Sequence, residues 1–199
     1  MNSGELLERS LAYALGSVAG VAPGSLGRGT PCGEWDLGEL LGHLDDALEA
    51  LHEGLTGGRI GLFPGVPGAD PACAFRTRAC AVLGAWAAGP PAEMVLVGER
   101  SLDVRVMGAV GAVEIAVHGW DVAQACGRPR PIPVSLAAEL LPVARCVVAR
   151  EDRGERFGAP VAVPAWAGFD VRLLAFLGRR DSAPGAGRDE GGCRQGERG

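Results

Sequence analysis

A chain of 199 residues is long enough for one domain with a tail, and its apolar fraction of 47% is ample for a hydrophobic core. The formal net charge of -5 gives no basic footprint, which argues against nucleic acid as a partner. No apolar run reaches the roughly 18 residues of a membrane span, and the N-terminus lacks the basic start of a signal peptide. We therefore expect a soluble cytoplasmic protein that binds neither nucleic acid nor a membrane.

Hydrophobic spacing predicts helices along most of the chain. The first covers residues 4–20. A second, longer helix begins after Asp36, which suits an N-cap because Glu39 follows three residues later, as in a capping box. Glycines at 54, 57 and 58 are expected to end this helix. A third helix, over residues 71–88, follows a loop rich in glycine and proline.

Three further helices are predicted, over residues 101–126, 135–149 and 170–177, the second of them despite Pro142 in its interior. Residues 94–97 could be extended or a packed connector, and residues 157–164 alternate like an edge strand or an extended arm. Residues 180–199 almost lack apolar side chains, which predicts a disordered tail. We therefore predict an all-α fold, a helical bundle over residues 1–179.

The six cysteines include no C-x-x-C pair, so a structural zinc knuckle is not expected. Without an export signal, reduced thiols are a simpler interpretation than disulfides. Cys193 falls in the predicted tail, and we interpret the other five cysteines as small core or surface residues.

The fourth predicted helix carries a carboxylate and an imidazole four residues apart, Glu114 and His118. About one helical turn separates them, so both side chains project from the same face. Burying two such groups is costly unless something pairs with them, and a divalent metal is one such partner. His43, at the edge of the apolar stripe of the second helix, could supply a third ligand across the bundle. Two histidines and one carboxylate with an open position are typical of a catalytic metal site.

These residues also have plainer interpretations, since a glutamate and a histidine four residues apart are often a local side-chain pair. Asp121 and Asp46 each lie one turn after a proposed ligand, where a carboxylate could orient an imidazole or carry a proton. Asp121 is our candidate catalytic residue, whereas exposure to solvent is an equal alternative for Asp46. We interpret His52 as a surface residue.

Other side chains could complete a site. Trp35 and Trp120 are interpreted as packing residues or pocket wall. A substrate carboxylate or a thiol cofactor could be bound by any of four arginines, Arg76, Arg78, Arg100 and Arg105.

Several segments resemble a known family. Residues 30–44, TPCGEWDLGELLGHL, resemble the start of the second helix in the DinB-like superfamily. They are most similar to the actinobacterial branch that includes the N-terminal domain of mycothiol-dependent maleylpyruvate isomerase. Residues 114–123, EIAVHGWDVA, match the pattern E-x-x-x-H-x-W-D-x-A of that branch. Residues 156–164 and 172–179 resemble its C-terminal signature, so that the resemblance spans about residues 5–179.

The resemblance implies a DinB-like four-helix bundle with a short C-terminal extension. It implies a divalent metal bound by His43, Glu114 and His118, with Zn2+ expected first and Ni2+, Fe2+ or Mn2+ as alternatives. It also implies a low-molecular-weight thiol such as mycothiol as cosubstrate, because relatives use such thiols in transfer and isomerisation. We therefore expect an enzyme that uses a thiolate for S-transfer to, or thiol-assisted isomerisation of, an electrophilic small molecule.

Other functions stay open. The same ligands could serve a thiol-independent cyclase, lyase or hydrolase of specialised metabolism, or a non-catalytic protein with a fully coordinated metal. Isomerases of this kind often carry a further C-terminal domain, for which a chain ending at residue 199 leaves no room. A related thiol transfer is therefore at least as plausible as maleylpyruvate isomerisation itself. A monomer and a homodimer are both compatible with the apolar arm near residues 159–164.

Overall fold

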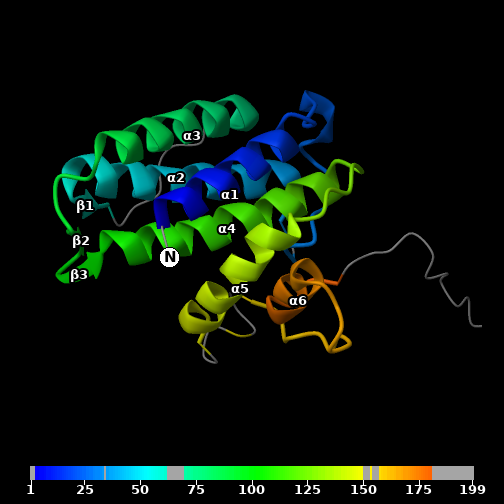
Figure 1. Ribbon diagram of the computed structural model, residues 1–199. Helices are drawn as coiled ribbons and strands as arrows, with labels where there is room; N and C mark the ends of the chain where they lie inside the picture. The colour runs from blue at the N-terminus through cyan, green and yellow to red at the C-terminus, as the bar shows by residue number, and fades with distance from the viewer. Residues whose placement is uncertain (1–2, 34, 62–69, 150–152, 154–156, 181–199) are drawn as a thin grey trace, which may run out of the picture.

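The computed structural model describes residues 3–33, 35–61, 70–149, 153 and 157–180, and the predicted all-α architecture is confirmed there (Figure 1). The helices are α1 (Ser3–Val18), α2 (Leu37–Gly57), α3 (Pro71–Ala88), α4 (Val104–Ala125), α5 (Val134–Val147) and α6 (Phe169–Phe176), with a short 3-10 helix, η1, at Pro23–Ser25. The predicted disordered tail, with Cys193, lies outside the described residues except for Arg180.

Helices α1 to α4 form the four-helix bundle (Figure 1). α1 packs along α4, and α2 packs against both α3 and α4. Their apolar stripes meet in one core, in which Leu11, Leu44, Phe75 and Ile115 are all fully buried. α5 packs on α4 and α1, and α6 packs on α5, so that these two helices form the C-terminal extension beside one end of the bundle.

The start of α2 is held by the predicted capping box. Asp36 Oδ1 accepts the Glu39 N–H at 2.9 Å, and Glu39 Oε2 accepts the Asp36 N–H at 2.9 Å. Gly58 ends the helix in the left-handed conformation, with φ 64°. This cap fixes the position of His43, about two turns into the helix, on the side that meets α4.

A three-stranded sheet, made by β1 (Arg59–Ile60), β2 (Met94–Val97) and β3 (Arg100–Asp103), covers the other end of the bundle. β2 pairs in parallel with β1 and antiparallel with β3. The extended interpretation of residues 94–97 is therefore confirmed. The predicted start of the fourth helix at residue 101 is wrong, because these residues pair with β2 and Asp103 then caps α4, accepting the Arg105 N–H at 2.7 Å.

The predicted arm at 157–164 lies beside α6 and is outside any regular strand. The Val161 N–H donates to the Ala175 carbonyl at 2.8 Å, and the pairing of Phe157 with Arg153 is an isolated bridge. No strand is assigned over residues 157–164, so the edge-strand alternative is wrong there and these residues form an arm beside α6.

Helix α4 lies at the centre of the molecule. By length and composition alone it could cross a membrane. However, 78% of its apolar 18-residue stretch is buried inside the protein, as in the core helix of a folded domain. Gly119 allows a close approach, since a Cβ there would lie 3.0 Å from the backbone of Ala14 in α1. Because α4 is covered on most sides, its polar residues His118 and Asp121 are buried, at 5% and 0% exposed.

Candidate metal centre and its pocket

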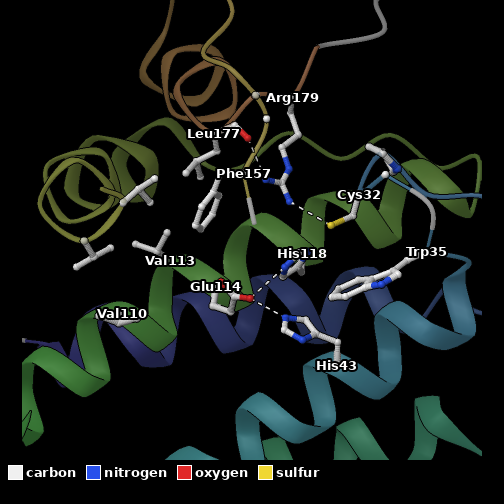
Figure 2. Close-up of a pocket in the computed structure, with 16 residues that line it drawn as sticks. Cys32, Trp35, His43, Val110, Val113, Glu114, His118, Phe157, Leu177 and Arg179 are labelled. Atoms are coloured by element: carbon white, nitrogen blue, oxygen red, sulfur yellow. Dashed lines mark hydrogen bonds and ion pairs between the residues drawn. The ribbon is translucent and has the colours of Figure 1, made fainter. Parts of the chain in front are cut away.

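The structure brings the three predicted ligands, His43 from α2 and Glu114 and His118 from α4, together between these helices (Figure 2). Glu114 Oε1 lies 2.7 Å from Nε2 of His43 and 3.1 Å from Nε2 of His118. The two imidazole rings meet edge to face, with their centroids 5.1 Å apart. One potential ligand atom from each residue lies within 4.8 Å of the other two.

The chemistry and spacing of these atoms fit a divalent cation. Zn–N bonds of about 2.0–2.1 Å place the ligand atoms of a tetrahedral site about 3.3 Å apart. The separations of 2.7 Å and 3.1 Å from the Glu114 oxygen are close to that value, so a small opening of the side chains would suffice. Three protein ligands are the number found in catalytic zinc sites, which leave a position for an exogenous ligand.

The charges of the site are strongly coupled. Burial raises the pKa of Glu114, but hydrogen bonds from His118 and His43 outweigh burial and hold this pKa far below its usual range. Burial lowers the pKa of His118, but hydrogen bonds with Asp121, Cys32 and Glu114 raise it well above its usual value. The carboxylate is thus kept ionised beside protonated imidazole, and a cation would take the place of the proton.

Asp121 lies behind His118 and holds its far ring nitrogen. Asp121 Oδ2 is 2.9 Å from His118 Nδ1 and accepts a hydrogen bond from Arg179 Nη2, also at 2.9 Å. Arg179 Nη1 donates to the Leu177 carbonyl at 3.1 Å. A carboxylate at Nδ1 favours the tautomer that leaves Nε2 free for a metal. This geometry supports the orienting alternative for Asp121, which does not line the pocket.

The three potential ligands form the floor of a pocket of about 1030 Å³. Its other lining residues are Pro31, Cys32, Gly33, Trp35, Val110, Val113, Val147, Val148, Phe157, Gly158, Leu177, Gly178 and Arg179. The Trp35 ring stands 4.7 Å from the His43 ring, between centroids, which confirms its interpretation as pocket wall. Trp120, by contrast, is buried in the core.

Two polar residues of the pocket, Cys32 and Arg179, were missed by the interpretation of the sequence. Cys32 is half-buried rather than a plain core or surface residue, and its Sγ lies 3.7 Å from Arg179 Nη2. Together with His118 and Asp121, Cys32 forms a second group of potential metal ligands within 4.8 Å of one another. Cys32 and Arg179 both lie in segments that resemble the family, so the resemblance could have identified them as site residues.

None of the four arginines predicted as substrate ligands lines the pocket. Arg78 pairs with Asp45 at 2.8 Å and with Glu49 at 3.4 Å. Arg105 pairs with Asp103 at 2.9 Å. The other two, Arg76 and Arg100, are exposed, and neither Asp46 nor His52 reaches the pocket.

Residues 7–123, which include all three potential ligands, match the family described as mycothiol maleylpyruvate isomerase N-terminal domain. The chain belongs to this family. Its fold is the DinB-like helical domain, as the resemblance implied, and membership associates the chain with mycothiol-related, enzyme-like chemistry. Two uncharacterized proteins of Mycobacterium tuberculosis, from different strains, are each 31% identical over 181 residues, covering 81% of this chain and 89% of the relative. No solved structure matches the chain significantly.

Proposed function

We propose that this family member is a metal-dependent enzyme that activates a low-molecular-weight thiol, such as mycothiol, for S-transfer to, or isomerisation of, an electrophilic small molecule. One observation carries the proposal: two imidazoles and a carboxylate converge at the floor of an open pocket in a domain of the mycothiol isomerase family. The same open pocket argues against a non-catalytic protein with a fully coordinated metal. We place the activity in the cytoplasm, where thiols are kept reduced.

The residues of the floor and Asp121 would have different roles. His43, Glu114 and His118 would hold the cation, with Zn2+ as the first candidate for this set. When bound, the cation stabilises the anion of a thiol at its free position, which supplies the nucleophile. Asp121 holds Nδ1 of His118, so that Nε2 stays available. Because all three floor residues are used as ligands, none is left as a general base, and the thiol proton would leave through the pocket to water.

Metal analysis combined with thiol calorimetry tests the proposal. We expect about one metal ion per chain in the purified protein, and mycothiol binding to the metal-loaded but not to the metal-free protein. Glu114→Gln should lose both. His52→Ala is the matched control, since it removes a histidine that does not reach the pocket.

Two other results would point elsewhere. Turnover of a substrate that is independent of any thiol would replace the proposal with metal-dependent lyase, cyclase or hydrolase chemistry. A tightly held metal that takes up neither mycothiol nor any other exogenous ligand would show a non-catalytic metal site.

A further inference from the structure

One side of the pocket is an apolar wall, made by Val110 and Val113 of α4, Val147 and Val148 at the end of α5, Phe157 of the arm, and Leu177. Figure 2 shows Val110, Val113 and Phe157 on the side of Glu114 that faces away from Cys32 and Trp35. The pocket is therefore polar at the floor and at the Cys32 end, and apolar along this wall.

Two residues of the apolar wall are partly exposed. Val110 and Val147 are 37% and 36% exposed, whereas their neighbours Val113 and Val148 are 4% and 8% exposed. Single exposed valines on a convex surface are ordinary, but exposed apolar side chains that line a concave pocket are typical of a ligand site. A ligand lying on this wall would remove both side chains from water.

The charges of the described lining residues do not favour an anionic ligand. Apart from the histidines, Arg179 is the cation among them, and its guanidinium already donates to Asp121, to the Leu177 carbonyl and towards Cys32. A substrate carboxylate would compete with a buried aspartate for that guanidinium.

The size of the pocket allows two small ligands. A volume of about 1030 Å³ lies at the upper end of the range of about 300–1,000 Å³ that accommodates a drug-sized molecule. A thiol at the floor and a second molecule on the apolar wall could therefore be held together, which is the arrangement that a bimolecular reaction needs.

We propose that the apolar wall binds the apolar body of an uncharged substrate, so that the electrophile is a neutral aromatic or aliphatic compound rather than a dicarboxylate. The reactive part of the substrate would face the floor and its apolar part the two partly exposed valines. The role of this ligand as the reaction partner rests on the proposed function. The preference of the wall for uncharged apolar ligands does not, because it follows from the lining residues alone.

A matched pair of fluorescent probes tests this preference on the full-length protein. N-phenyl-1-naphthylamine is uncharged, and 8-anilinonaphthalene-1-sulfonate carries the same rings with a negative charge. We expect saturable binding of the neutral probe in fluorescence titrations, about tenfold tighter than that of the sulfonate. Val110→Asp and Val147→Asp should each weaken the neutral probe about tenfold, because they place a charge where apolar surface is buried.

Two control variants share the helices but not the pocket. Val106→Asp on α4 and Val134→Asp on α5 alter valines that are 45% and 54% exposed and do not line the pocket. They should leave the affinity for the neutral probe within about twofold of the unsubstituted protein. Circular dichroism and thermal unfolding of all four variants show whether each one is folded at the temperature of the titration.

Binding of the sulfonate as tightly as the neutral probe would overturn the inference, and so would equal affinities in all folded variants. The titrations need neither metal nor thiol, so their outcome is separate from that of the proposed function. If the probe results hold while mycothiol fails to bind, the apolar site stands and the thiol chemistry fails. If mycothiol binds and the probe results fail, the inference about the substrate falls alone.

Discussion

Replacing Asp121 by Asn should weaken metal binding although it removes no ligand. Asp121 is fully buried, and its Oδ2 lies 2.9 Å both from His118 Nδ1 and from Arg179 Nη2. An amide keeps the shape but leaves the buried guanidinium without its counter-ion, which costs roughly 3–5 kcal/mol of folding free energy when a buried pair is broken. The amide NH2 can also donate to Nδ1, which favours the tautomer with a proton on Nε2. Loss of such a partner lowers metal affinity about 10–100-fold, or about 1.4–2.8 kcal/mol of binding free energy.

Competition with a chromophoric chelator measures this zinc affinity, and urea unfolding measures the loss of stability. The nitrogen chemical shifts of His118 report its tautomer directly. A loss of stability without a change at His118 would leave these shifts unaltered. Arg180→Ala is the matched control, because it removes the exposed arginine next to Arg179 and should leave the affinity within about twofold. A folded Asp121→Asn protein with unchanged zinc affinity and an unchanged His118 tautomer would refute the orienting role of Asp121.

Three further predictions address the floor and the core. Glu114→Gln should lower zinc affinity at least about 100-fold in the same competition assay, while His52→Ala should not change it. Although burial lowers the pKa of His118, hydrogen bonds with acidic neighbours raise it above its usual value, so a proton must leave before Nε2 binds metal. Zinc affinity should therefore rise with pH up to that raised pKa and level off above it, and calorimetry in different buffers should detect the released proton; a pH-independent affinity would contradict this. Gly119→Ala should destabilise the fold by about 1–3 kcal/mol, because its Cβ would lie 3.0 Å from the α1 backbone. Gly84→Ala, on α3, adds a Cβ with no atom within 4 Å other than its chain neighbours and the nearby backbone of α3. It should instead stabilise the fold by up to about 1 kcal/mol in urea unfolding.

Local patterns predicted the bundle and brought the three potential ligands into consideration. The helical spacing of leucines and the capping box at Asp36 depend on residues within one or two turns, so they can be recognised without knowledge of the fold. The four-residue spacing of Glu114 and His118 is equally local. The pairing of these two with His43 was predicted from its position on the second helix and from a family motif. In the structure, both imidazoles contact the same Glu114 oxygen.

Contacts between distant segments could not be predicted in the same way. Cys32 and Arg179 are 147 residues apart in the chain, and they meet in one pocket because α6 packs on α5, which in turn packs on α4 and α1. Residues 101–103 were assigned to a helix because the apolar run of α4 follows directly. Their strand conformation depends on pairing with β2 across the turn at Gly98, whose φ is 61°. The sequence alone could not show whether Arg78 binds substrate or pairs within the protein, because its ion pair with Asp45 joins two different helices.

The pocket is assembled from two parts of the chain that do different things. The residues that form the floor lie within the family match over 7–123, whereas most of the apolar wall, from Val147 to Leu177, follows that match. Substrate preference could therefore change through the C-terminal extension while the floor stays the same. Arg179 limits that independence, because the guanidinium at the end of the extension also holds Asp121 behind His118. A shift of α6 large enough to reshape the wall would move this guanidinium. A change at the proposed substrate site would therefore also affect the metal centre, through the contact of Arg179 with Asp121.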